Sequence, residues 1–429
     1  AGLYRTSSTG DRRTWTLSVW VKRNLLGGWQ NIIGGANNTP ASYVYFNADN
    51  QIAVHEYQVG VPTNFYTETT RVFRDVGAWY HIVVNFDSTQ GTAANRMKIW
   101  INGVQETSFD VLISPSQNFQ TQFNENGLTQ YIGRNYTSND FFKGQLAEMH
   151  WLDGVTKPAS NFGETNSATG QWIPKEYEGG SYGTNGFYLK FASGAIGTDS
   201  SGNGNNHTVQ SLANTDVVTD TPTNNFCTWN SIDLITNMTI SEGNLKAAKS
   251  SNAWNFIFGT MAVSTGKWYW EMTASSGGSV GDMFFGVAAV NLSRVSAVQD
   301  SATAKANGFL TYNDDGTYML DAGSRQSYGS AITNNDVLAI ALDLDNGTAK
   351  FYKNNSALAS IDISSSALAG KDILPIFSGY YTGASWTFDF GQKDFTHTPP
   401  SGYVALSTAN LPAPAIPLPS SQFNTVLYT

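Results

Sequence analysis

Apolar side chains recur at every second position along much of this chain. Between residues 14 and 22, Trp15, Leu17, Val19 and Val21 are apolar, and the positions between them are polar except for Trp20. An extended strand with one buried face places alternate side chains on opposite sides in this way. The same pattern returns in residues 80–86, 97–101, 147–151, 268–272, 338–344 and 386–390. The chain is therefore predicted to consist mainly of half-buried strands.

Turn-forming residues separate these strands. Segments with a helical repeat of apolar side chains are hard to find, whereas Gly, Asn, Asp, Ser and Thr cluster between the strand patterns. This arrangement favours antiparallel sandwiches over an α/β fold. Asn102-Gly103 and Asn346-Gly347 lie where hairpins are expected, because Asn and Gly accept the positive φ of tight turns. We predict an all-β protein.

Charge and composition exclude several classes of protein. The 429 residues include 24 Lys and Arg and 33 Asp and Glu, which gives a formal net charge of −9. A nucleic-acid-binding protein of the usual basic kind is therefore not expected. No apolar run approaches the roughly 18 residues that a membrane helix needs, so membrane insertion is not expected. The single cysteine, Cys227, excludes an intramolecular disulfide.

Composition also divides the chain. Residues 198–225 are rich in Gly, Asn, Ser, Thr and Asp, which is typical of a linker. Residues 398–429 contain several prolines and are predicted to form an extended connector to a further module. The linker separates a first sandwich, residues 1–197, from a second sandwich, residues 226–397.

Motifs in the first half resemble a known family. Residues 79–103 pair the strand WYHIVV with a second strand that ends in IWING. Residues 131–134 read YIGR, and residues 142–148 read FKGQLAE. Together these motifs resemble the laminin-G-like domains of the concanavalin A-like lectin and glucanase superfamily, over about residues 1–195.

Motifs in the second half resemble a SPRY domain, over about residues 226–395. They are GKWYWE at 266–271, FGVA at 285–288, DVLAIALD at 336–343, FYKN at 351–354, LPIF at 374–377 and WTFDFG at 386–391. The two resemblances imply two concanavalin A-like antiparallel β-sandwiches of the jelly-roll type in tandem, followed by the Pro-rich connector.

The order of these modules resembles that of large tail-fibre-like proteins of marine bacteriophages. This resemblance implies an extracellular virion surface or fibre protein that forms a homo-oligomer, for example a trimer. Its partners would be other virion proteins and glycans or proteins of the host-cell surface. Two alternatives stay open: a capsid decoration or structural spacer protein, and a secreted or surface-attached bacterial adhesin that binds glycans.

Catalytic patterns are missing from the sequence. The superfamily includes glycoside hydrolases, whose paired carboxylates lie about 5–5.5 Å apart when they retain configuration. No Glu-x-Asp-x-x-Glu or Glu-x-Asp-x-Glu pattern occurs. The nearest carboxylates, Glu148 with Asp153 and Glu176 with Glu178, lack that alternation. The five histidines include no pair spaced to hold one metal ion. We expect a non-enzymatic protein without a required cofactor.

One segment has the spacing of a cation-binding loop. Asp199, Ser201, Asn203 and Asn205 place oxygen atoms at alternate positions, which can surround a hard cation such as Ca²⁺. No Glu follows at the twelfth position, as it would in an EF-hand. The alternative interpretation is a Gly- and Asn-rich turn without a metal.

Aromatic residues in predicted loops are the other candidate binding residues. Sugar rings stack on flat aromatic faces, while neighbouring amides and carboxylates bind hydroxyl groups. The candidates are Trp29, Tyr136 with Asn139 and Asp140, and the pair Tyr380 and Tyr381 with Trp386. The resemblance to SPRY domains, whose edge loops form the partner-binding surface, supports the last pair. The alternative for each aromatic residue is that it packs inside the protein.

Overall fold

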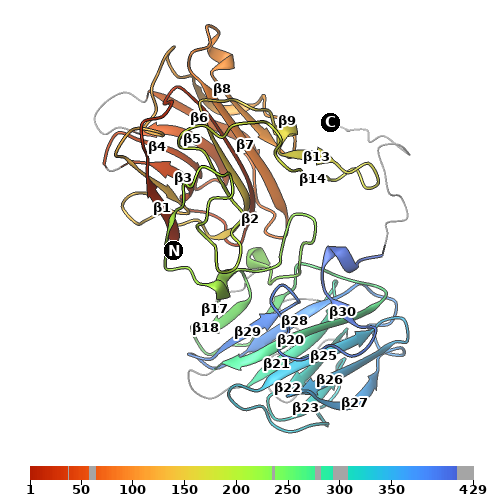
Figure 1. Ribbon diagram of the computed structural model, residues 1–429. Helices are drawn as coiled ribbons and strands as arrows, with labels where there is room; N and C mark the ends of the chain where they lie inside the picture. Colours follow the sequence, from red (N-terminus) through yellow and green to blue (C-terminus); the bar gives the residue numbers. More distant parts are fainter. Residues whose placement is uncertain (37, 58–63, 234–236, 276–281, 293–307, 413–429) are drawn as a thin grey trace. The chain divides into compact units, whose positions relative to one another are not determined.

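The computed structural model of the protein describes residues 1–36, 38–57, 64–233, 237–275, 282–292 and 308–412. Within these ranges the chain forms β-strands and short 3₁₀ turns, with no α-helix (Figure 1). The all-β prediction is confirmed. None of the described helical turns has the length and hydropathy required to cross a membrane. The chain divides into two compact units, built mainly from Ala1–Val217 and from Asn224–Leu411.

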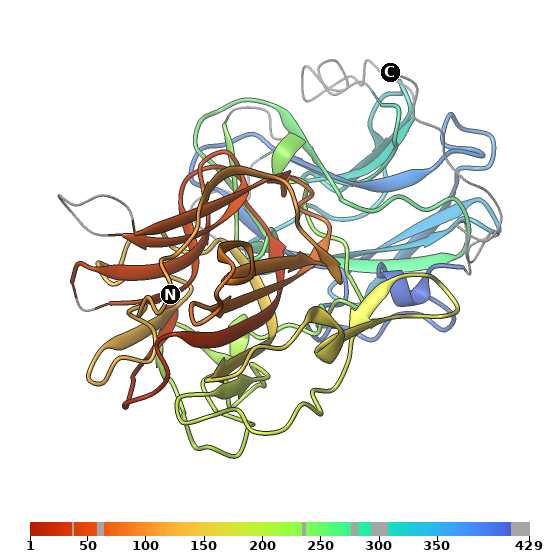
Figure 2. The ribbon, with the colours of Figure 1, turned by 90° about the horizontal axis from the view of Figure 1, so that it is seen from above.

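The first unit is a sandwich of two antiparallel sheets, whose strands are coloured red to yellow-green in Figures 1 and 2. The eight-stranded sheet has the order β10 (Phe109–Ile113), β6 (Phe65–Val72), β5 (Gln51–Tyr57), β4 (Ala41–Phe46), β3 (Gln30–Gly35), β11 (Thr129–Ile132), β1 (Gly2–Thr6), β16 (Thr208–Gln210). The six-stranded sheet has the order β15 (Phe187–Leu189), β12 (Gly144–Asp153), β2 (Thr14–Arg23), β7 (Trp79–Asp87), β8 (Met97–Ile101), β9 (Val104–Gln105).

The alternation in β2 fixes which of its faces is buried. Trp15, Leu17, Val19 and Val21 all lie in the core of the first unit, where the Trp15 ring stacks on Phe86 with the ring centroids 5.2 Å apart. Burial of apolar area at about 25 cal/mol per Å² is the main stabilising contribution of such a core. The period of two therefore predicted the inner face of this strand correctly.

Residues 155–182, which we call the covering segment, pack on the outer face of the six-stranded sheet. This segment contains a hairpin of β13 (Gly163–Thr165) and β14 (Trp172–Pro174). Its Phe162 clusters with Val83 and Leu152 of the sheet. Much of this outer face is therefore buried as well.

The covering segment explains why Trp20 breaks the alternation of β2. The Trp20 ring faces outward and stacks on the His81 ring, with centroids 4.7 Å apart. Trp172 of the covering segment donates a hydrogen bond from Nε1 to His81 Nδ1 over 2.9 Å. Trp20 is therefore buried although it lies on the outer face of the sheet.

The second unit is also a sandwich of two sheets. One has the order β17 (Met238–Ser241), β18 (Lys246–Lys249), β29 (Ser385–Asp389), β20 (Lys267–Ser275), β25 (Val337–Asp343), β26 (Thr348–Lys353), β27 (Ser356–Asp362), and β30 (Val404–Ala405) also pairs with β20. The other has the order β19 (Asn255–Phe258), β28 (Ile373–Gly379), β21 (Met283–Ala289), β22 (Phe309–Asn313), β23 (Thr317–Leu320), β24 (Gln326–Ser327). A large apolar core that includes Trp229, Trp270 and Trp386 lies between them.

Parts of the predicted linker and connector belong to the sheets. Residues 208–210, inside the predicted linker 198–225, form β16 and pair with β1. Residues 404–405, inside the predicted connector 398–429, form β30, and the next residue, Leu406, is fully buried in the second core. The last part of that connector, residues 413–429, lies outside the described residues.

Candidate functional site

Aromatic side chains form a row across the outer face of the eight-stranded sheet. Strand register places Tyr131 opposite Tyr4, Tyr43 opposite His55, and His55 opposite Tyr66. All five side chains are half-buried. Residues next to them in sequence, such as Val44 and Val54, lie in the core, so the row must face away from it. We call these five residues the aromatic row.

Gly34 keeps the aromatic row continuous between β11 and β4. It lies opposite both Tyr131 and Tyr43 in the register. A Cβ atom added at Gly34 would lie only 2.7 Å from the Tyr43 ring. The glycine therefore leaves room for Tyr43 to lie across β3, toward Tyr131.

Several predicted residues lie at the margin of the aromatic row. Trp29 is 51% exposed and stacks on Tyr45, with centroids 5.1 Å apart; Tyr45 is the next outward position of β4 after Tyr43. Burial and the nearby Tyr136 and Asp140 together raise the pKa of Tyr43. The structure thus brings Trp29, Tyr136 and Asp140 close to the same sheet face.

Hydrogen bonds fix the loop that carries Tyr136. Asn135 donates from Nδ2 to Asp140 Oδ2 over 2.8 Å, and Asn139 donates from its backbone N–H to Asn135 Oδ1 over 2.8 Å. The Asn31 N–H donates to the Asp140 carbonyl over 2.9 Å, which anchors the loop to β3. Asn139 and Asp140 are exposed, so both are accessible to a ligand.

His55 and Tyr66 of the aromatic row are uncharged at neutral pH. Burial lowers the pKa of His55 to about 4 and raises the pKa of Tyr66 to about 12. The Tyr66 hydroxyl donates to Glu68 Oε2 over 2.9 Å, and the His55 and Tyr66 rings lie 4.7 Å apart. Such a surface offers flat apolar faces with polar groups at their edges, which suits the faces and hydroxyl groups of sugars.

A second aromatic surface lies at one edge of the second unit. The Trp254 ring contacts Tyr380 and Phe284, with centroids 5.2 Å and 4.5 Å away. Tyr380 packs edge-on against Tyr381, which is 42% exposed. Thr382 donates from both its N–H and its hydroxyl to Asn252 Oδ1, each over 2.8 Å. The predicted pair Tyr380 and Tyr381 therefore belongs to a larger aromatic edge. Trp386, which was predicted with this pair, is instead fully buried in the core of the second unit.

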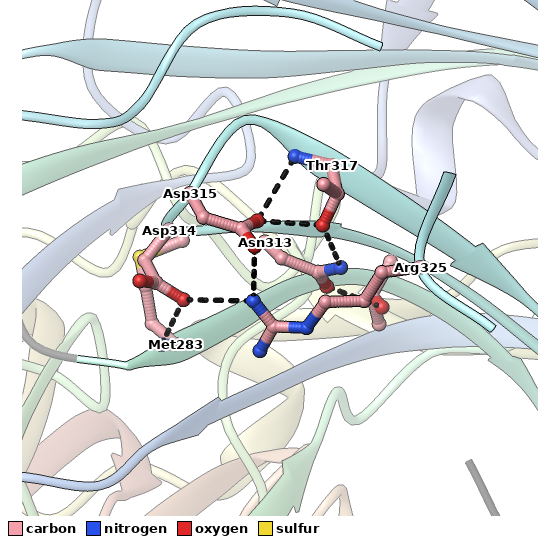
Figure 3. A network of polar contacts seen from close by, with 7 residues as sticks. Met283, Asn313, Asp314, Asp315, Thr317 and Arg325 are labelled. Carbon is pink, nitrogen blue, oxygen red and sulfur yellow. Dashed lines mark hydrogen bonds and ion pairs between the residues drawn. The ribbon is translucent and has the colours of Figure 1, made fainter. Parts of the chain in front are cut away.

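A charged network adjoins the aromatic edge (Figure 3). Arg325 forms ion pairs with Asp315 at 2.5 Å and with Asp314 at 3.9 Å, and its guanidinium lies 5.6 Å from the centroid of Phe284. Burial and the neighbouring Asp282 raise the pKa of Asp314 to about 6. Within the described residues, Arg325 Nε and Nη2 are buried and make no hydrogen bond.

The predicted calcium loop uses its oxygen atoms inside the protein. The Asp199 carboxylate accepts hydrogen bonds from the N–H groups of Tyr188, Ser201 and Asn205. Although burial acts to raise it, these hydrogen bonds lower the pKa of Asp199. Arg5 donates to Asn205 Oδ1 over 2.6 Å. A guanidinium at this oxygen favours the metal-free turn.

Asn203 completes this loop as an anchor. Its Nδ2 donates to the carbonyl oxygens of Gly183 and Gly186 over 2.8 Å and 2.9 Å, and the Ser201 hydroxyl donates to Asp199 over 2.9 Å. In the described part of the chain, no three His, Cys, Asp or Glu side chains form a metal-binding cluster.

Glu148 and Asp153, the first pair of carboxylates considered for catalysis, are bound to neighbouring groups. Glu148 accepts a hydrogen bond from the Tyr188 hydroxyl. Asp153 is buried and accepts hydrogen bonds from the N–H groups of Asp11 and Asn185 over 2.7 Å and 2.9 Å. Both contacts hold strands and loops of the first unit in place.

Sequence reasoning missed most of the residues on both surfaces. Within the first unit it missed Tyr43, His55 and Tyr66, although Tyr43-x-Tyr45 and His55-x-Tyr57 are aromatic at alternate positions. In the second unit it missed Trp254 and Arg325. These two lie far from Tyr380 in sequence, and no local pattern connects them.

Comparisons with known proteins agree with two domains in this order. Residues 4–160 match the family model of the concanavalin A-like lectin/glucanases superfamily, and residues 267–393 match the SPRY domain model. The ATP-dependent RNA helicase DDX1 of Xenopus laevis is 28% identical over 170 residues, which are 39% of this chain and 21% of the helicase. The chain thus spans about a fifth of the length of this curated relative.

Solved SPRY structures are similar to part of the chain. The SPRY domain of human HERC1 is 15% identical, with 36% of this chain and 94% of that chain covered. A human SPRY domain is 14% identical, with 37% and 98% covered. The TRIM65 PSpry domain is 16% identical, with 38% and 89% covered. Each has a TM-score of 0.30. On the two matched family models, the chain contains a laminin-G-like domain of the concanavalin A-like superfamily followed by a SPRY domain.

Proposed function

We propose that this protein is a non-enzymatic virion surface or fibre protein that contacts saccharides of a host cell. The aromatic row carries the proposal, because five half-buried aromatic rings lie in register across neighbouring strands on one face of the sheet. Neighbouring strands lie about 4.8 Å apart, so the row extends over several sugar units of a polysaccharide. The order of the two domains, which resembles that of phage tail-fibre-like proteins, supports the virion location.

The aromatic edge of the second unit would contribute a separate contact to a host glycan or protein. Trp254, Tyr380 and Tyr381 supply ring faces, and the adjacent ion pairs of Arg325 supply polar groups. Each contact would be weak. Several copies in a homo-oligomeric fibre would raise the overall affinity because later contacts become intramolecular.

Affinity electrophoresis in gels that contain soluble neutral polysaccharides tests the role of the aromatic row. The wild-type chain should migrate more slowly in one of these gels than in a plain gel. Each ring stack contributes about 1 kcal/mol, so the double variant Tyr43→Ala/Tyr66→Ala should bind roughly thirtyfold more weakly. Tyr403→Ala removes a half-buried tyrosine elsewhere and should leave the migration unchanged. Equal retardation of the double variant and the wild type would refute the assignment.

Two further experiments address the other parts of the proposal. Tyr380→Ala/Tyr381→Ala should reduce binding of the chain to glycan arrays or host cells, and unchanged binding would remove the aromatic edge from the proposal.

Antibody labelling of intact particles in the electron microscope should locate the chain on the virion surface. A fixed lattice position without any glycan binding would instead favour a decoration or spacer protein, and recovery only with cell envelopes would favour an adhesin.

A further inference from the structure

A groove of about 340 Å³ lies on the outer face of the six-stranded sheet of the first unit. Its floor is formed by Asn85 and Asp87 of β7 and by Lys98 and Trp100 of β8, and its walls include Gln90 and Asn95. A volume of this size is at the lower end of ligand sites, which are about 300–1,000 Å³. It is large enough for one or two sugar residues.

Strand register explains why the four floor residues face the same side. Asn85 lies directly opposite Lys98, and Trp100 lies two residues beyond Lys98 on the same strand. Ile99 and Phe86, which alternate with them, lie in the core. The floor residues therefore project outward together, and opposite pairs have Cβ atoms about 5 Å apart. Regular strands hold this arrangement.

The two charged groups of the groove, Asp87 and Lys98, differ in whether they already have a partner. Asp87 accepts hydrogen bonds from the Thr89 hydroxyl over 2.5 Å and from Gln90 Nε2 over 2.6 Å. Although partial burial acts to raise it, these hydrogen bonds lower the pKa of Asp87. Among the described residues, Lys98 Nζ has no carboxylate within ion-pair distance. The groove thus presents one occupied carboxylate and one free ammonium group.

Asn85 adds a positioned amide. The Thr16 hydroxyl lies 2.9 Å from the Asn85 amide and donates to the Val155 carbonyl over 2.8 Å, so one polar atom of the amide is held inside the protein. The Asn85 side chain is nine-tenths buried, at 9% exposure. Asn85 also lines the groove, where its other polar atom can bind a ligand.

We propose that the groove binds a carboxylated sugar, such as a uronic or sialic acid residue. The sugar ring would stack on Trp100, its carboxylate would pair with Lys98, and its hydroxyl groups would bind the amides of Asn85, Gln90 and Asn95. A neutral sugar would leave the Lys98 ammonium unpaired. A phosphate dianion is less suitable because Asp87 lies beside the single cation. The inference deepens the proposed function, since it adds a second saccharide site and names its ligand.

Ligand-observed NMR and calorimetry on the full chain test this site with two matched probes, methyl glucuronide and methyl glucoside, which differ only in the carboxylate. An ion-paired carboxylate is expected to give about a tenfold preference for the glucuronide, which should weaken as salt is raised. The methyl glycoside of N-acetylneuraminic acid distinguishes a sialic from a uronic acid ligand.

Lys98→Gln should abolish the preference for the glucuronide, whereas Lys175→Gln, which removes an exposed lysine of the same unit, should retain it. Trp100→Phe keeps an aromatic ring that can pack against the covering segment, and it should weaken the binding of both probes. Absence of any preference, or a preference that survives Lys98→Gln, would overturn the inference. Tyr43→Ala/Tyr66→Ala should leave the preference intact, so failure of the aromatic row and failure of the groove give different results.

Discussion

Replacement of Glu56 by glutamine should remove the contribution of this one residue to the pH dependence of the stability of the first unit. Glu56 faces the core from β5, on the side opposite to the aromatic row, and is only 1% exposed. The Ser42 hydroxyl donates to one carboxylate oxygen, and Gln122 Nε2 donates to the other over 3.3 Å. Burial raises the pKa of Glu56 from its ordinary value of 4.5 to about 7, despite these hydrogen bonds.

The sign and size of the effect follow from this shift. Between pH 4.5 and pH 7 the folded protein retains a proton on Glu56 that the unfolded chain releases. The stabilising contribution is complete below the unfolded pKa and is lost as the pH rises through the folded pKa. At 1.36 kcal/mol per pKa unit, the wild type should lose about 2.5 kcal/mol from this group between about pH 5 and pH 8. Glu56→Gln cannot ionise at this position and should not show that loss.

Urea unfolding of both proteins at about pH 5 and pH 8 measures this difference. Hydrogen exchange of the amides in β4 and β5 identifies the transition that belongs to the first unit. The difference between the two proteins, compared between the two pH values, isolates Glu56 because all other titrating groups are shared. Glu164→Gln, which changes an exposed glutamate on β13, serves as the control and should follow the wild type.

Parallel pH profiles for wild type and Glu56→Gln would refute the reasoning. They would mean that Glu56 ionises in the folded protein as readily as in the unfolded chain, which requires water to reach Ser42 and Gln122. A large loss of stability in Glu56→Gln at both pH values would instead mean that the carboxylate is needed as an anion at this position.

Three other substitutions or additions test features of the same sandwiches. Asp153→Ala should destabilise the first unit by about 2–4 kcal/mol in urea unfolding, because it leaves buried N–H donors without an acceptor. Addition of Ca²⁺ should leave the melting temperature unchanged, since Asp199 already accepts hydrogen bonds from three N–H groups; a clear increase would revive the calcium site. Gly286→Ala should destabilise the second unit by several kcal/mol, because the added Cβ would lie 2.0 Å from the carbonyl oxygen of Leu310.

Local sequence patterns were sufficient for strands and for their buried faces. The alternation in Trp15, Leu17, Val19 and Val21 depends only on neighbouring residues, and the core contains all four. Trp20 was an exception that local pattern could not explain, because the His81 ring that covers it comes from another strand. The same limit applies wherever the outer face of a sheet is covered by a distant segment.

The aromatic row required information that one strand does not contain. Tyr43, His55 and Tyr66 lie about a dozen residues apart, and only the pairing of β4, β5 and β6 places them side by side. A shift of one residue in either register would turn one of these side chains into the core. The sequence therefore predicted the ring-bearing strands but not the surface that they form together.

Polar composition likewise misplaced part of the linker. Residues 208–210 are all exposed, and an exposed edge strand has no apolar face that would distinguish it from a loop. Their pairing with β1 appears only in the tertiary structure. The same reasoning applies to β30, whose two residues are identified as a strand only through β20.

Under the proposed function, the two faces of the first unit would recognise a saccharide differently. The aromatic row would offer ring faces that many polysaccharides could use with little discrimination. The groove on the opposite sheet, which residues of the covering segment also line, would select for charge through the Lys98 ammonium group. Since regular strands carry both surfaces, little conformational entropy would be lost when a ligand binds. A ligand chain that supplies neutral sugars to the row and acidic sugars to the groove would therefore be bound more selectively than the area of the row alone allows.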